Sequence, residues 1–197
     1  MFDNGLTMKQ QVHRICQTVY FEIRRIKLIH QFLTTEATTT LAMFLVLSCL
    51  DYNNSLLAGI PQKPVNKVQH VINCAAHLVC KDPRCEDVGL VDLPWLSAEC
   101  RILYKIATIC YSMISGTAPP YPSNILELYI PSCTLHSFAD NFNFHIPKRC
   151  RKFQGQWNFS FTGLSIWNNL PFSVQHAQIL SSFTSQLKTH HFLVSYS

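Results

Sequence analysis

A mainly α-helical fold is predicted by three features of the amino-acid sequence. Apolar residues recur every three or four positions along several segments, which is the spacing of one helical face. Glycine or proline follows most of these segments and ends a helix there. Hydrophobic residues make up 48% of the 197 residues, which is enough for a sizeable core and too much for a disordered polar tract.

The first predicted helix covers Met8 to Ile29. Arg14 and Arg25 point away from its apolar face, while Arg24 and Lys27 lie toward its C-terminal end, where cations suit the helix dipole. The apolar face repeats with spacings of 3, 4, 4 and 3 residues and consists of Val12, Ile15, Val19, Ile23 and Ile26.

The second predicted helix begins after Thr34 or Thr35, whose hydroxyl can cap it. It runs to about Leu57, where Gly59 and Pro61 stop it. Because this segment is apolar on nearly all sides, it is predicted to be a central, buried helix.

The third predicted helix covers Val65 to Lys81, and Pro83 ends it. Its core stripe consists of Val65, Val68, Ile72, Ala75 and Val79. At about 100° per residue, the opposite face carries Lys67, His70, Cys74, His77 and Lys81.

The fourth predicted helix runs from about Ser97 to Ser115, and Gly116 is placed to cap its C-terminus. Its inward residues are Ile102, Ile106, Ile109 and Met113. The four helices together predict a helical bundle over residues 1–116.

Residues 117–197 are predicted to form a smaller C-terminal extension. A proline-rich bend at 117–122 precedes a short helix at 124–129, and loops with one or two short strands are expected over 131–160, including a weak alternation at 156–161. A closing helix from Ser181 or Ser182 to about Phe192 would bury Phe183 and Leu187.

Composition narrows the class of protein. The formal net charge of +5 permits a nucleic-acid partner without requiring one. The most apolar segment is too short and too often interrupted to span a membrane, and residues 1–10 lack the apolar core of a signal peptide. Nine irregularly spaced cysteines do not form an even-numbered disulfide framework. We therefore expect reduced thiols and an intracellular location, in the nucleus or cytoplasm, with no membrane partner.

Possible catalytic and metal sites are poorly supported. The local cluster of His70, Cys74, His77, Cys80 and Cys85 lacks a CxxC pair or a recognised finger spacing, so a solvated helix face is favoured over a zinc site. No cysteine has a nucleophile context, and no glycine loop could hold a phosphate. The sequence Phe-Ala-Asp at 138–140 continues with asparagine and has no acidic partner strand. We expect no catalytic residue and no metal site.

Two clusters of basic residues remain as candidate phosphate contacts. Arg24, Arg25 and Lys27 form one, and residues 148–152 form the other. Each cluster is small, so for either one alone a solvated surface is the favoured interpretation.

Five phrases of the sequence resemble the C-terminal part of the reverse transcriptase of LINE-type (non-LTR) retrotransposons, jockey-like and related. Their order and spacing carry the resemblance over nearly the whole chain. The phrases are Gln31 to Ala37, Leu50 to Gly59, Gly116 to Tyr121, Trp167 to Pro171 and Ser181 to His190.

This resemblance implies a helical thumb-like bundle followed by the extension beyond the thumb. The family's fingers and palm, with the aspartates that bind Mg²⁺, would lie upstream of Met1. These 197 residues alone would therefore not polymerise DNA and would need no cofactor. They would keep at most a weak grip on an RNA–DNA or RNA duplex through its backbone, and they would have no small-molecule substrate.

The departures from the family concern its arginines. The family usually has arginine at the positions of Cys49, His70, His77, Cys133 and His136. A single transition converts an arginine codon of the CGN type to cysteine or histidine. Arginine at all five positions would raise the formal charge of +5 by five. We hypothesise that the outward face of the third helix was a phosphate-facing surface that is now partly neutralised.

The leading hypothesis is thus a non-catalytic retroelement remnant with weak nucleic-acid binding. The alternatives are a helical protein-interaction module without a nucleic-acid role, a zinc module, and a chain that is not made or does not fold alone. The candidate nucleic-acid contacts are Arg14, Arg24, Arg25, Lys27, Lys67, His70, His77, Lys81, Lys148, Arg149, Arg151 and Lys152.

Overall fold

The computed structural model describes residues 8–52, 54–80, 93, 95–118, 143–146 and 159–196. The described part is mainly helical, as predicted. Phe144 forms an isolated bridge there, and no described segment is a strand. The helix predicted at 124–129 and most of the segment expected to hold short strands lie outside the described residues.

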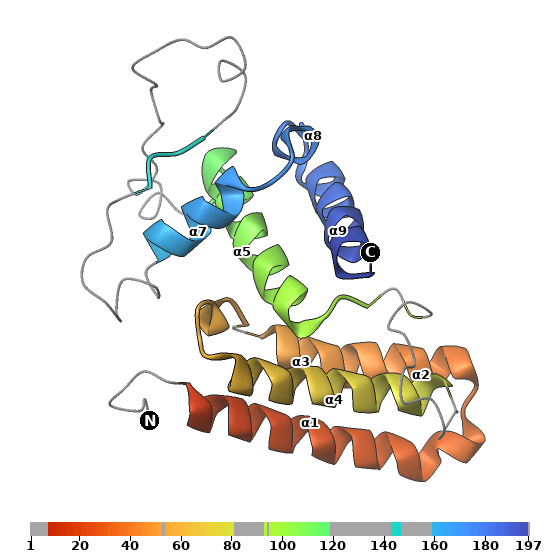
Figure 1. The fold of residues 1–197 in the computed structure, drawn as a ribbon. Coiled ribbons are helices and arrows are strands. Elements are labelled where there is room, and N and C mark those ends of the chain that lie inside the picture. The colour runs from red at the N-terminus through yellow and green to blue at the C-terminus, as the bar shows by residue number, and fades with distance from the viewer. Residues whose placement is uncertain are drawn as a thin grey trace. The chain divides into compact units, whose positions relative to one another are not determined.

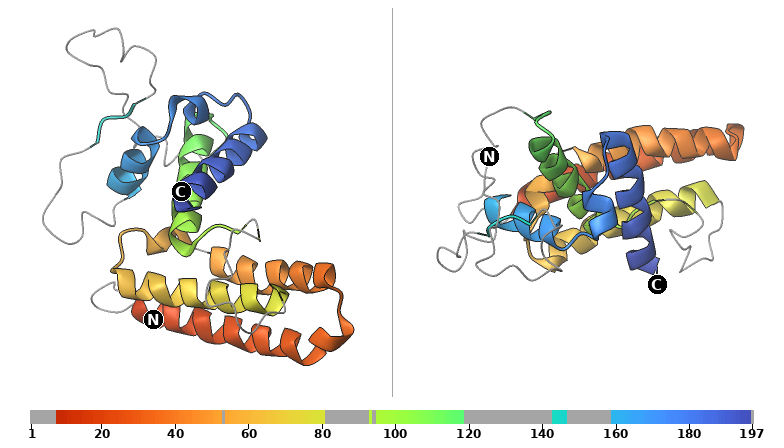
Figure 2. Two further views of the ribbon diagram at one scale, coloured as in Figure 1. Left: turned by 45° about the vertical axis from the view of Figure 1, so that its right-hand side comes forward. Right: turned by 90° about the horizontal axis from the view of Figure 1, so that it is seen from above.

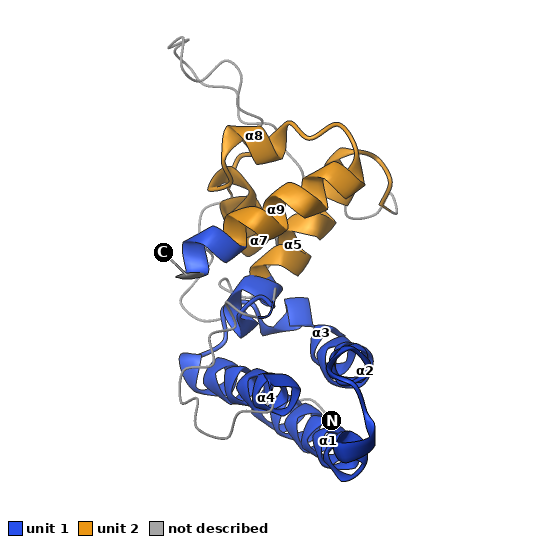
Figure 3. Ribbon diagram, turned by 90° about the vertical axis from the view of Figure 1, so that its right-hand side faces the viewer, with its two compact units in different colours: residues 1–102, 192–197 blue, residues 103–191 orange. Residues whose placement is uncertain are grey.

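The chain divides into two compact units, shown in Figure 3. The first unit comprises residues 1–102 and 192–197, and the second comprises residues 103–191. The domain boundary that the sequence predicts, between residues 116 and 117, stays a prediction.

Three helical layers make up most of the first unit. They are α1 (Lys9–Ile29), the segment formed by α2 (Thr35–Leu41), η2 (Ala42–Leu47) and α3 (Ser48–Asp51), and α4 (Gln62–Cys80). Helices α1 and α4 lie side by side and run in the same direction, and the α2–η2–α3 segment runs in the opposite direction (Figures 1 and 2). Each layer contacts the other two.

The apolar stripe predicted for the first helix is confirmed in α1. Four of its five residues are buried, and Ile15 is half-buried. The buried thiol of Cys16 completes the inward face. It lies about 40° from Val12 around the helix, so it belongs to the same side of α1.

The start of the second predicted helix is confirmed, because the Thr34 hydroxyl accepts a hydrogen bond from the Ala37 amide at 3.2 Å. Its continuation as one regular helix to Leu57 is wrong. The backbone becomes π-helical over η2, α3 ends at Asp51, and a separate 3₁₀ turn, η3, covers Asn54–Leu57.

The prediction that this segment is central and buried is also wrong. Met43 is 51% exposed and Phe44 is 72% exposed. In a bundle of three layers each helix packs one side against the other two, and Ala42, Val46 and Leu47 do so here. No described element covers the other side of η2.

The core stripe predicted for the third helix is confirmed in α4, since all five of its residues are buried. Pro64 sits in the first turn, where a missing amide hydrogen is tolerated. Lys67 and His70 are exposed, whereas Cys74 and His77 are half-buried.

The fourth predicted helix is α5 (Ala98–Ile114), and its first residues belong to the first unit. Ile102, Ile106 and Met113 are buried as predicted. Gly116 caps the helix at φ 69°, and its amide donates to the Met113 carbonyl at 3.3 Å.

The second unit is built from the rest of α5 with α7 (Phe159–Asn168), α8 (Phe172–Gln175) and most of α9 (Leu180–Tyr196). Residues 159–161, which were expected to alternate as a strand, begin a helix. Phe183 and Leu187 of the predicted closing helix are fully buried, as predicted. The ring of Phe183 stacks on Tyr111 with centroids 4.3 Å apart.

The phrase Trp167–Pro171 has a structural role in this unit. Trp167 is 1% exposed and stacks on Phe183 with ring centroids 5.9 Å apart. The side-chain amide of Asn168 accepts from the Phe144 amide at 3.0 Å and donates to the Phe144 carbonyl at 2.9 Å. Gln175 donates to the Trp167 carbonyl at 2.7 Å. The two bonds of Asn168 hold Phe144 against α7.

Candidate nucleic-acid interface

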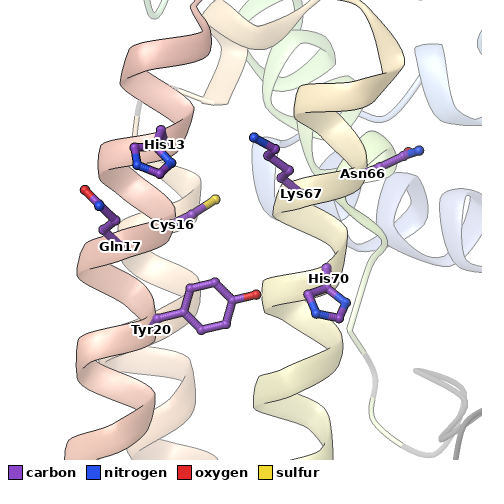
Figure 4. Close-up of a pocket in the computed structure, with 7 residues that line it drawn as sticks. All are labelled: His13, Cys16, Gln17, Tyr20, Asn66, Lys67 and His70. Atoms are coloured by element: carbon purple, nitrogen blue, oxygen red, sulfur yellow. The ribbon is translucent and has the colours of Figure 1, made fainter.

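A groove of about 380 Å³ lies between α1 and α4 in the first unit (Figure 4). Both helices contribute polar side chains to it, and the Tyr20 ring and the Lys67 amine reach into it from opposite sides. The residues that line it are His13, Cys16, Gln17, Tyr20, Asn66, Lys67 and His70.

The two helices are parallel along this groove, which aligns their polar residues turn by turn. His13 lies level with Asn66, and Tyr20 lies level with His70. The Cys74 thiol, one turn further along α4, is close enough to the Tyr20 hydroxyl to influence its pKa.

The Lys67 ammonium gives the groove a positive charge, and the Cys16 thiol that also lines it is not ionised. Burial raises the pKa of the Cys16 thiol, although the nearby Lys67 ammonium acts in the opposite direction. Partial burial, and then the neighbouring Cys74 and Cys16 thiols, raise the pKa of the Tyr20 hydroxyl. Both groups therefore stay protonated at neutral pH, and the Lys67 charge is not neutralised by either.

Carboxylates are absent from this face of the two helices. Helix α4 contains no acidic residue, and α1 contains only Glu22. Glu22 lies on the other side of α1, where it pairs with Arg25 at 3.3 Å. An anion in the groove would meet no carboxylate from either helix.

Several polar groups in the groove are available to a ligand. Within the described part of the chain, His13, Gln17, Lys67 and His70 make no side-chain hydrogen bond or ion pair. The Asn66 carbonyl oxygen accepts from Gln62 at 3.0 Å, which leaves the amide nitrogen of Asn66 as a donor.

The predicted contact residues divide into three groups. Arg24 and Lys27 fall on the groove side of α1 at 100° per residue, and Lys67, His70 and His77 fall on the adjoining side of α4. Arg14 and Arg25 are exposed on the opposite side of α1, so the structure does not bring them to the groove. The others lie outside the described residues: Lys81, Lys148, Arg149, Arg151 and Lys152.

Other residues of this face were not predicted. Four of them line the groove: His13, Gln17, Tyr20 and Asn66. Two more, Lys9 and Lys63, are exposed nearer the N-terminal ends of α1 and α4. The helical period alone places Lys9, His13 and Gln17 on one side of α1. The sequence therefore indicates that these three residues share one side of α1, but it does not indicate that this side packs beside α4.

Metal and disulfide chemistry find no support in the described residues. No group of three or more His, Cys, Asp or Glu side chains among them is arranged to hold a metal ion. They offer neither a zinc site at His70, Cys74 and His77 nor the carboxylates that Mg²⁺ needs. Four of the described cysteines are free thiols: Cys16, Cys49, Cys74 and Cys110. None of the described helices is long and apolar enough to cross a membrane.

In comparisons with known protein families, with curated proteins and with solved structures, the chain matches none.

Proposed function

We propose that the chain derives from the thumb and post-thumb region of a LINE-type reverse transcriptase, and that it binds the backbone of an RNA–DNA or RNA duplex weakly. The proposal assigns no catalytic role to any residue of the chain. The sequence resemblance motivates the ancestry. The binding surface, called here the α1–α4 face, consists of Lys9, His13, Gln17, Tyr20, Arg24, Lys27, Lys63, Asn66, Lys67, His70 and His77.

The observation that carries the proposal is the charge of this face. Five lysine or arginine residues lie on it, and neither helix places a carboxylate there. Helix α1 has 21 residues and so spans roughly 30 Å, which is enough to follow several phosphates along one strand. Contacts from lysine and arginine to phosphate are independent of base sequence, as expected for a grip on a duplex.

The affinity is expected to be low. Histidine occupies positions 70 and 77, where the polymerases that the sequence resembles usually carry arginine, and the imidazole lacks the permanent charge and forked donors of a guanidinium. Each phosphate contact contributes about 0.9 to the slope of log K against log salt for double-stranded DNA, so the loss of two contacts lowers both slope and affinity.

A fluorescence anisotropy titration with a labelled RNA–DNA hybrid tests the proposal. The full chain should bind at low salt, and the Lys67→Ser variant should lower the salt slope by about 0.9. Arg14→Ser removes the same charge from the opposite side of α1 and should leave the slope unchanged. His70→Arg should raise the slope by about the same amount. Absence of binding at low salt would contradict the proposed grip.

A second candidate function is a helical protein-interaction module, which the exposed apolar side chains of the first unit favour. Leu28 is 78% exposed, Phe32 is 79% exposed and Phe44 is 72% exposed. Large exposed apolar side chains can contribute to an interaction surface. This candidate predicts association that does not weaken between low and moderate salt and that is lost in a Phe32→Ser, Phe44→Ser variant. Sedimentation velocity at two salt concentrations would detect self-association of this kind.

A further inference from the structure

We infer that the groove between α1 and α4 receives one unpaired nucleobase of a single-stranded or splayed segment, with the adjoining phosphate at Lys67. This inference rests on the proposed function, because it names the part of the nucleic acid that the same face recognises. Binding to a duplex through its phosphates alone would require exposed lysine or arginine residues but no cavity.

The size of the groove favours a single base. Its volume of about 380 Å³ lies toward the lower end of the range of small-ligand pockets. It can hold one planar ring system with a neighbouring group. The bases of a duplex are stacked and paired, so they cannot enter a recess between two helices unless one of them leaves the stack.

The walls of the groove suit a planar heterocycle. Tyr20, His13 and His70 bring aromatic rings to it from both helices (Figure 4). Base stacking on aromatic side chains is tolerant of sequence and is the usual means of holding unpaired bases.

The polar groups of the groove match the edge of a base. Gln17 presents an amide with both donors and an acceptor, and Asn66 presents a donor from the opposite helix. Side-chain amides of this kind can pair with a base edge through two hydrogen bonds. In Figure 4 the two amides point away from the gap between the helices, so each side chain must rotate to meet a base that lies there.

The charge of the groove matches the phosphate that must accompany the base. Lys67 extends its amine across the groove toward α1 (Figure 4). The neighbouring thiol of Cys16 stays protonated, and the nearest carboxylate of α1 is on its other side. A phosphate at Lys67 therefore meets a cation and no opposing anion.

The test compares three probes by fluorescence anisotropy with the full chain. They are a single-stranded RNA, the same backbone with abasic sites in place of its bases, and an RNA–DNA hybrid with the same number of phosphates in one strand. We expect the RNA to bind about tenfold more tightly than the abasic strand, because stacking and edge contacts are lost in the latter. The His13→Trp variant fills the groove without removing a lysine or arginine and should abolish this difference.

Two further variants separate base contacts from charge contacts. The double variant Gln17→Ala, Asn66→Ala should reduce the preference for the RNA over the abasic strand and leave the salt slope unchanged. Arg14→Met should leave both unchanged, and circular dichroism melts check that each variant is folded. Equal affinity for the RNA and the abasic strand would overturn the inference while leaving the proposed duplex grip intact. A failure of all three probes to bind would overturn both.

Discussion

Arg101 and Asp51 form an ion pair with 2.7 Å between Nη1 and Oδ2, although they stand fifty residues apart in the chain. The Arg101 guanidinium also donates from Nε to the Leu96 carbonyl at 3.0 Å. The Asn54 amide in turn donates to the Arg101 carbonyl at 3.4 Å. These contacts tie the start of α5 to the end of α3 within the first unit.

Removing this arginine should destabilise the chain. The Arg101 side chain is only 14% exposed, but Asp51 is 42% exposed, so solvent weakens the pair. We expect Arg101→Ala to lower the free energy of unfolding by about 1–2 kcal/mol in urea titrations. Arg25→Ala removes an arginine whose side chain is 63% exposed; it is the control and should cost less than about 0.5 kcal/mol. Equal losses in the two variants would contradict the anchoring role.

Replacing Gly116 tests the cap of α5. Its φ of 69° is in the left-handed region, and an added Cβ would meet no atom within 4 Å, so only the backbone conformation is at stake. Gly116→Ala should therefore cost about 1 kcal/mol of stability, measured by urea unfolding. Gly116→Asn should cost less, because asparagine adopts this conformation more readily. An alanine variant as stable as the parent chain would show that the cap is dispensable.

Truncating Phe183 should disrupt the core of the second unit. The ring is fully buried and lies against both Tyr111 and Trp167. Phe183→Ala is expected to cost about 3–5 kcal/mol, because a cavity replaces the ring. The near-ultraviolet circular dichroism of the two stacked aromatics should collapse with it. Lys188→Ala, an exposed change on the same helix, should stay within about 0.5 kcal/mol of the parent.

Stability should depend on pH through His191. Burial, followed by the neighbouring His190, lowers the pKa of His191 to about 4. A histidine in the unfolded chain takes up its proton near pH 6.5. The unfolded state therefore binds the proton first as the pH falls. The stabilisation that His191 gives as a neutral side chain is present above about pH 6.5 and is lost as the pH falls toward 4.

Urea titrations at pH 7.5 and pH 4.5 measure this effect. The parent chain should lose roughly 2 kcal/mol more between these pH values than the His191→Gln variant. His145→Gln changes an exposed histidine of the same unit and should reproduce the parent's pH dependence. Identical pH profiles for the parent and His191→Gln would rule out this linkage.

Much of the helical structure could be predicted because its causes are local. The Thr34 cap and the Gly116 cap depend on residues within one turn of the helix end. The buried stripes of α1, α4 and α9 follow from a period that any amphipathic helix must show, since each buries one side. The misassigned strand at 159–161 covers too few residues for the helical and extended periods to be told apart.

The exposure of η2 could not be predicted from its composition. A segment that is apolar on all sides is buried on all sides only when neighbouring layers cover it. Phe44 stays exposed because no described element of the first unit packs over it. The number of layers depends on how the whole bundle packs, so the spacing of apolar residues within one helix does not reveal it.

The chain's own sequence was sufficient for the helical class, the core stripes and the cations of each helix, because each depends on spacing within a few turns. The groove depends on how two distant helices meet. Only the parallel packing of α1 on α4 brings His13 and Tyr20 of one helix beside Lys67 and His70 of the other. That register is set by side chains interlocking across some fifty residues of intervening chain, and periodicity within one helix carries no information about it.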